Sequence, residues 1–117
     1  DILPTMKRAS EGRIIWFELR RKMFKDKKVF FDINEHILSF ARSIKGVEVA
    51  VLFKENLKSK NEIRVNLRSQ GNVDVNKIAL HFSGGGHRTA SGCTVKGKLA
   101  DVKKRVLAKI KAALPAV

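Results

Sequence analysis

Residues 82–92 combine residue types that can bind an anion. Three consecutive glycines, Gly84 to Gly86, lead directly into His87 and Arg88. Helix and strand interiors disfavour such a run, which is expected where the backbone must approach something closely or where φ is positive. Successive N–H groups of such a turn form an anion-binding concavity, and His87 and Arg88 stand beside it as donors. The stretch predicts a site for phosphate or a similar anion; the alternative is a flexible loop without a ligand.

The sequence carries no recognisable machinery for cleaving a bound phosphate. Hydrolysis of a phosphodiester at neutral pH usually needs metals held by clustered Asp, His or Glu. In this sequence the acidic residues are scattered singly and the three histidines are far apart. There is no HExxH, no cysteine cluster, no GxSxG, and no Lys-Ser/Thr after the glycines that would make a P-loop. We therefore predict an anion-binding site without catalytic residues or metal ligands in this chain.

The charge of the chain favours a polyanionic partner. Lys and Arg number 25 against 11 Asp and Glu, which gives a net charge of +14. Residues 61–117, which include the glycines, hold eleven basic and three acidic residues. Such a balance favours nucleic acid, nucleotides or another anionic surface. Without a block of five like charges, the alternative is a surface that lysines merely make soluble.

Length and composition bound the class of protein. At 117 residues the chain is expected to form one domain with a real core. No apolar run approaches the length of a transmembrane helix, so no membrane partner is expected. Cys93 is the single cysteine, which excludes an internal disulfide and suits a reducing compartment, so a cytoplasmic location is predicted.

The elements that must position the glycines begin with a strand and a helix. Residues 13–19 are β-branched and aromatic and predict a strand, whereas residues 1–12 predict a linker or short helix. A helix is predicted over about 35–45 from apolar residues at helical spacing. Asp32 and Asn34 are suitable N-caps for it, and a glycine at 46 ends it.

Two strands then precede the glycines. Residues 47–54 form the clearest strand, and a second follows at residues 63–68. In the second strand, apolar residues alternate with Arg64, Asn66 and Arg68, so the two arginines share one face. Arg68 lies at the strand's end, toward the glycines, and is the stronger candidate for an anion contact.

The remaining elements complete an α+β domain. Asp74 predicts the N-cap of a helix over about 75–82, and a strand is expected at about 92–96. A last helix begins near residue 99 with Asp101 as its cap. The order of elements predicts an α+β fold, a single domain with a mixed sheet of about four to five strands flanked by helices.

Several segments in a fixed order resemble a known family. Val65–Ser69, Gly71–Ala79 and Phe82–Gly92 resemble the C-terminal DHH-associated domain of DHH-family phosphoesterases, whose signature is Gly-Gly-Gly-His followed by Ala-Ser-Gly. Ser43–Glu55 resembles the preceding passage in the oligoribonuclease/pAp-phosphatase (nanoRNase; exopolyphosphatase-related) branch. Ser83 departs from the pattern, because many members have a fourth glycine there.

The resemblance implies a substrate-binding role within a larger hydrolase. In the family, an N-terminal DHH domain holds two divalent metals, usually manganese, and the associated domain binds the nucleotide or phosphate end of the substrate across a cleft. The DHH motif is missing here, so residues 1–12 are expected to lead from a preceding DHH domain, and residues 13–117 to form the substrate-binding domain, inactive alone. The DHH domain would be its partner in cis. The resemblance assigns phosphate contacts to Arg68, Gly84, Gly85, Gly86 and His87, and secondary contacts are expected from Arg64, Ser83, Arg88 and Ser91.

Other functions stay open at this point. The chain could be a nucleic-acid-binding module without an enzymatic parent, using its lysine-rich last helix. It could also belong to a RecJ-like exonuclease or a cyclic-dinucleotide phosphodiesterase, which share the glycine motif, or be a dimerisation domain. Short RNA, pAp, cyclic dinucleotides and longer single-stranded DNA all remain candidate substrates, and a homodimer of the parent protein remains a candidate assembly.

Overall fold

The computed structural model describes residues 6–21, 36–59 and 61–116. Six strands in this part of the chain form one mixed sheet: β1 (Lys7–Ala9), β2 (Ile14–Leu19), β3 (Val49–Glu55), β4 (Glu62–Ser69), β5 (Gly85–His87) and β6 (Ala90–Lys96). Their order across the sheet is β1-β2-β3-β4-β6-β5. Only β2 and β3 pair in parallel; the other neighbours are antiparallel. The α+β prediction is confirmed, with six strands instead of four to five.

The two additional strands are the short ones, β1 and β5. Residues 7–9, for which the sequence predicted a linker or helix, pair with β2 instead. The second and third glycines of the triplet lie in β5, where a loop was expected, and pair with β6. Three-residue strands carry too little alternation to be recognised locally, because their pairing depends on partners elsewhere in the chain.

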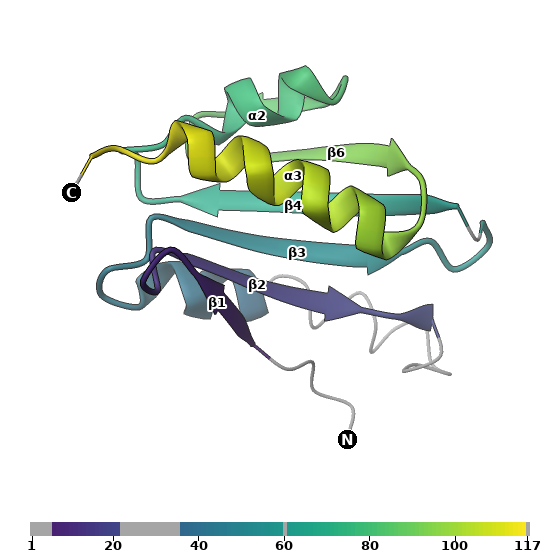
Figure 1. Ribbon diagram of the computed structural model, residues 1–117, viewed down its shortest axis with the longest axis horizontal. Helices are drawn as coiled ribbons and strands as arrows, with labels where there is room; N and C mark the ends of the chain where they lie inside the picture. The colour runs from purple at the N-terminus through teal and green to yellow at the C-terminus, as the bar shows by residue number, and fades with distance from the viewer. Residues whose placement is uncertain (1–5, 22–35, 60, 117) are drawn as a thin grey trace.

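Two layers of helices cover the sheet unequally. α2 (Val75–His81) and α3 (Leu99–Ala113) contribute to the larger core cluster on one face. A helix over residues 36–43 contributes to a smaller cluster with β2 and β3 on the other face (Figure 1). Among the described residues, that smaller cluster contains no side chain from β4, β5 or β6. Within the described residues, the face opposite α3 is therefore covered over β2 and β3, and no apolar layer covers it over β4 and β6.

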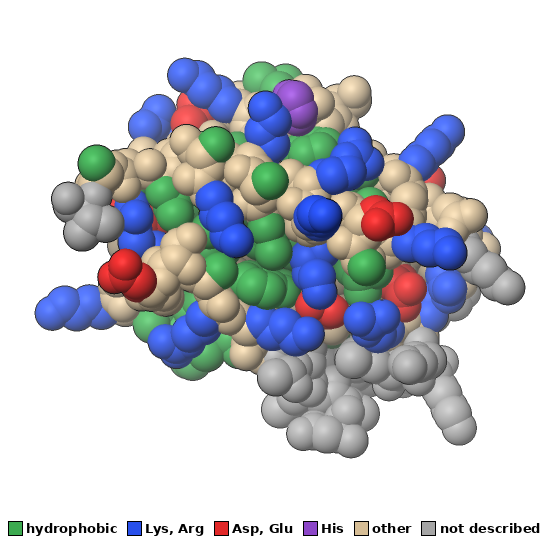
Figure 2. All heavy atoms as spheres, in the orientation of Figure 1, with side chains coloured by type: hydrophobic (Ala, Val, Ile, Leu, Met, Phe, Trp, Pro, Cys, Tyr) green, Lys and Arg blue, Asp and Glu red, His purple; other side chains and the backbone are tan. Residues whose placement is uncertain are grey.

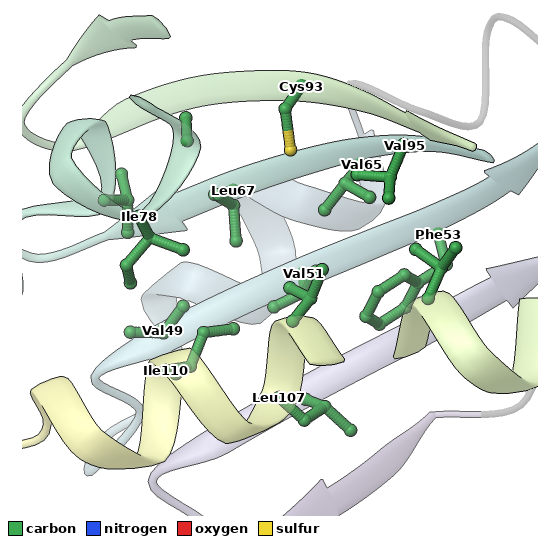
Figure 3. Packing of buried hydrophobic residues seen from close by; sticks show 14 of the residues in the cluster. Val49, Val51, Phe53, Val65, Leu67, Ile78, Cys93, Val95, Leu107 and Ile110 are labelled. Atoms are coloured by element: carbon green, nitrogen blue, oxygen red, sulfur yellow. The ribbon is translucent and has the colours of Figure 1, made fainter. Parts of the chain in front are cut away.

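The burial of β3 and β4 follows from this uneven cover. Val49, Val51 and Phe53 of β3 point into the cluster under α3 (Figure 3). The residues between them, Ala50 and Leu52, are buried in the cluster under the helix over residues 36–43. Because both faces of β3 are buried, its first five residues, 49–53, are continuously apolar. The side of β4 toward α3 is buried, Asn66 and Arg68 on its other side are buried and half-buried, and its apolar and polar residues alternate as predicted.

The helix ends were predicted in part. Asp74 is the N-cap of α2, and its carboxylate accepts hydrogen bonds from the amides of Asn76 and Lys77, as expected. The predicted start of α3 near residue 99 is confirmed, but the predicted cap was wrong, because Lys98 is the N-cap without a side-chain hydrogen bond and Asp101 lies in the first turn. The N-caps expected at 32 and 34 lie outside the described residues. No helix in the described ranges is long and apolar enough to cross a membrane.

Candidate functional site

The register of three strands places Arg68 and His87 in one row. Arg68 of β4 pairs with Ala90 of β6, and Ala90 pairs with His87 of β5. Directly paired residues in antiparallel strands project to the same face. At a strand spacing of about 4.8 Å, the Cα atoms of Arg68 and His87 are roughly 10 Å apart. The two residues thus flank Ala90 on the face that lacks an apolar layer.

Arg64 lies on the same face, over a glycine of β6. A Cβ atom added to Gly92 would lie 2.5 Å from Nη2 of Arg64 and 3.1 Å from Oδ1 of Asn66. Glycine at this position therefore leaves the space that the guanidinium occupies. Nη1 of Arg64 also donates to Oγ1 of Thr94 at 3.3 Å. We call Arg64, Asn66, Arg68 and His87 together the open face.

The glycine triplet allows β5 to lie against β6. A Cβ on Gly84 would lie 2.2 Å from the carbonyl oxygen of Gly92, and a Cβ on Gly86 would lie 2.7 Å from the carbonyl oxygen of Ala90. Gly86 also has a φ of +147°. Both conditions predicted from the sequence, close approach and positive φ, are confirmed.

The amide of the first glycine is not directed at a ligand. The N–H of Gly84 donates to the carbonyl of Ala79 at 2.8 Å, and the N–H of Ser83 donates to the carbonyl of Leu80 at 3.0 Å. These bonds close the C-terminal end of α2. Ser83 adopts a φ of 65° at this turn, a conformation that suits glycine best. Gly84 and Ser83 therefore act first as the connection from α2 to β5.

Arg88 and Ser91 are directed away from the open face. Nε of Arg88 donates to the carbonyl of Gly71 at 2.8 Å, and its Nη1 lies 3.5 Å from the carboxylate of Asp74. Ser91 is buried, and its hydroxyl donates to the carbonyl of Val75 at 2.7 Å. The structure does not bring these two predicted secondary contacts together with Arg68. They hold α2 against the β5–β6 hairpin.

Sequence reasoning missed a groove beside Arg68. It has a volume of about 400 Å³ and lies between the helix over residues 36–43 and the end of β4. Its lining is polar and comprises Ser39, Arg42, Ser43, Ser69, Gln70 and Thr89. Nε2 of Gln70 donates to the carbonyl of Arg42 at 2.7 Å and joins the two walls. No local signal could have found this groove, because its walls are about 28 residues apart in sequence.

A second charged cluster, on the α3 side of the sheet, is centred on a buried carboxylate. Glu18 is 5% exposed, and its carboxylate lies 2.9 Å from Nζ of Lys103, 3.3 Å from Nζ of Lys7 and 3.1 Å from Nη2 of Arg20. Burial acts to raise the pKa of Glu18, but the hydrogen bonds from Lys103 and Trp16 and the charge of Lys103 outweigh it and lower the pKa to about 2. We call this the Glu18 cluster.

The remaining titratable groups do not add a metal or nucleophile site. Burial raises the pKa of the Cys93 thiol, as expected for a small packed residue. In the described ranges, no group of three His, Cys, Asp or Glu residues is placed to hold a metal ion. The chemistry available on the open face is that of hydrogen-bond donors and positive charge, which suits binding an anion and not cleaving one.

Comparison with known proteins identifies the family. The model of the DHHA1 domain matches residues 22–115. The chain belongs to the DHHA1 family. This match confirms the DHHA1 resemblance that the glycine motif predicted. The predicted oligoribonuclease/pAp-phosphatase branch is confirmed by the relatives described next.

The DHHA1 domain is similar to part of larger phosphoesterases. It is 31% identical over 103 residues to the bifunctional oligoribonuclease and PAP phosphatase NrnA of Mycoplasma genitalium, covering 86% of this chain and 31% of that protein. The NrnA of Thermus thermophilus is 35% identical over 75 residues, covering 63% of this chain and 22% of the relative. The chain thus spans less than a third of these relatives.

A solved structure shares the fold. An exopolyphosphatase-related protein from Bacteroides fragilis superposes with a TM-score of 0.69 at 28% identity, over 92% of this chain and 32% of the other. The DHHA1 domain therefore corresponds to about a third of that protein. Relatives of this kind are consistent with a DHH catalytic domain in cis.

Proposed function

We propose that this DHHA1 domain binds the phosphate-bearing nucleotide end of short RNA or of pAp-like nucleotides for a DHH phosphoesterase. The observation that carries the proposal is the row formed by Arg68, Ala90 and His87 on the open face. A guanidinium can bind two phosphate oxygens at once, and an imidazole about two strands away can donate to the same or a neighbouring phosphate. Ala90, which lies between them in the row, has only a methyl side chain.

The surroundings of this row support an anionic ligand. No ion pair joins Arg64, Arg68 or His87 to a carboxylate within residues 6–21, 36–59 and 61–116. An anion that binds there does not have to displace a resident carboxylate. The names of the relatives, oligoribonuclease and PAP phosphatase, favour nucleotides among the possible anions.

The proposed division of labour separates binding from cleavage. The described residues do not fit a metal site, so we assign the two divalent metals of the reaction to a DHH domain that would face the open face. The DHHA1 domain would orient the scissile phosphate toward those metals. Positioning of this kind lowers the activation barrier because the reacting groups are already aligned.

A titration with nucleotides tests the proposal. The chain is titrated with pAp and with a 5′-phosphorylated dinucleotide at increasing salt, and Arg68→Ala combined with His87→Ala is compared with the parent. Loss of two charge-assisted contacts is expected to weaken binding at least tenfold. A control pair, Arg8→Ala with His36→Ala, removes the same residue types from exposed positions and should bind as the parent does.

Two results would overturn the proposal. One is equal affinity of the Arg68/His87 double variant and the parent while both remain folded by circular dichroism. The other is parent binding that does not weaken with salt, because phosphate contacts release counterions and make affinity salt-dependent. In the full-length protein, the same double variant should lose hydrolysis of both substrates in the presence of manganese.

A further inference from the structure

A second groove lies on the other side of the sheet, between α2 and the C-terminal half of α3. Its volume is about 490 Å³. Its rim carries four side chains that can donate to an anion, namely Lys77, His81, Arg88 and Lys109, and Ile78 contributes to its apolar floor. Figure 2 shows that Lys and Arg side chains are spread over this face of the molecule. We call it the α2–α3 groove.

The one carboxylate in this groove already has partners. Asp74 accepts from the amides of Asn76 at 3.0 Å and of Lys77 at 3.3 Å, and it lies 3.5 Å from Arg88. Lys77 and Lys109 are exposed, and neither forms an ion pair with another residue of the described ranges. The positive charges in the groove therefore outnumber the negative charge and attract an anion.

The β5–β6 turn connects this groove with the open face. His87 stands in the row with Arg68, and the next residue, Arg88, lines the α2–α3 groove. The end of β4 and the C-terminal end of α3 lie at the same end of the sheet (Figure 1). A polyanion held by His87 and Arg68 would therefore meet Arg88, on the rim of the α2–α3 groove, as its next basic residue past the turn.

We propose that the α2–α3 groove binds the phosphodiester backbone of RNA nucleotides beyond the one held on the open face. The inference rests on the proposed function and extends it from one nucleotide to a strand. The groove suits the backbone more than the bases, because Lys77 and Lys109 are point charges and no Phe, Trp or Tyr is among the described residues that line it. It would make short RNA a better ligand than pAp.

A length series tests the inference. Binding of pAp and of RNA dinucleotides, tetranucleotides and hexanucleotides to the chain is measured by titration at several salt concentrations. The parent is expected to bind the hexanucleotide about tenfold more tightly than the dinucleotide. Lys77→Ala combined with Lys109→Ala should abolish this gain, leave the affinity for pAp unchanged, and reduce the salt slope for the hexanucleotide by about 1.4.

A matched control pair distinguishes the loss of contacts in the α2–α3 groove from a general loss of positive charge. Lys58→Ala with Lys104→Ala removes the same charge from exposed positions outside the grooves described above, and it should keep the gain with length. Absence of a gain in the parent, or an equal loss in both lysine pairs, would overturn the inference. The proposed function is tested separately, by the dependence of pAp binding on Arg68 and His87. The proposed function and the inference about the groove can therefore fail independently.

Discussion

The open face and the Glu18 cluster both gather positive charge, but on opposite faces of the sheet. In the Glu18 cluster, one buried carboxylate receives the charges of Lys103, Lys7 and Arg20. Glu18 also accepts a hydrogen bond from Nε1 of Trp16 at 3.2 Å. Each of these three cations has a carboxylate partner within the fold, although the three share one negative charge.

Among the described residues, the open face has no carboxylate partner for its arginines. Nη1 of Arg68 donates to the backbone carbonyl of Leu67 at 2.9 Å, and Arg64 bonds the hydroxyl of Thr94. In the part of the chain that the structure describes, neither arginine forms an ion pair with a carboxylate. The difference between the clusters teaches that a net charge of +14 does not locate a binding site. We propose the open face as the site because strand register also brings Arg68 and His87 into one row there.

The largest expected effect is on stability, in the Glu18 cluster. Glu18→Gln keeps the shape of the side chain and removes the charge that several cations share, so the free energy of unfolding should fall by about 2 kcal/mol. Removing one partner of a fully buried ion pair lowers the free energy of unfolding by more than this. Here the loss is smaller because the Lys7 and Arg20 side chains are 46% and 40% exposed, so that water can solvate their charges. Urea unfolding near neutral pH measures this. Arg68→Ala is the comparison on the open face. Because Arg68 is proposed to bind a ligand and not to stabilise the fold, this variant should change the free energy of unfolding by less than about 0.5 kcal/mol.

The contribution of the Glu18 charge to stability should also appear when the free energy of unfolding is measured at acidic pH. The pKa of Glu18 is about 2 in the folded chain against an ordinary 4.5, so the folded state favours the carboxylate. Its contribution is complete above about pH 4.5 and is lost as the pH falls through 2. The stabilities of the parent and of Glu18→Gln should therefore converge over this interval. A constant difference between them down to pH 2 would show that the charge of Glu18 is not what stabilises the cluster.

On the open face, the expected effect is on binding. Gly92→Ala places a Cβ 2.5 Å from Nη2 of Arg64. The guanidinium is the far end of a flexible side chain and must move, so binding of pAp should weaken about fivefold, or about 1 kcal/mol, with a smaller loss of stability. Arg64→Ala should weaken binding equally. The double variant should lose no more than either single variant; additive losses would show that Gly92 acts independently of Arg64.

The smallest expected effect is at the turn that leads into β5. Ser83 has a φ of 65°, which glycine adopts without steric cost. Ser83→Gly should raise the free energy of unfolding by about 0.5 kcal/mol and leave pAp affinity unchanged. Thermal unfolding together with the nucleotide titration measures both. A clear loss of pAp affinity would instead place the Ser83 hydroxyl among the ligand contacts.

Much of the fold could be predicted because its longer elements carry strong local patterns. The alternation in β4, the cap of α2 at Asp74 and the alternation of Val49, Val51 and Phe53 in β3 each encode an element directly. The strand count was wrong, because β1 and β5 contain three residues each. Segments that short form strands only because a neighbouring strand supplies their hydrogen bonds.

The candidate site could be predicted only as a set of residue types. Alternation along residues 62–69 placed Arg64 and Arg68 on one face, and the glycine triplet predicted a close backbone approach; both depend on local geometry. Nothing local showed that Arg88 bonds to Gly71 and Asp74, or that Ser91 bonds to Val75 on the opposite face. Because Arg88 and Ser91 are close to His87 in the sequence, we predicted that all three share one site. The fold instead directs the side chains of Arg88 and Ser91 away from the open face.

The sequence by itself determined that this is a basic α+β domain of the DHHA1 family with an arginine-bearing strand and a glycine-histidine motif. These properties reside in composition, spacing and alternation. Only the tertiary structure decided that β6 lies between Arg68 and His87. It also decided that one set of cations gathers around Glu18 and that Arg88 lines another groove. The physical reason is that strand pairing and charge compensation join residues far apart in the chain, so the folded sheet selects the partners.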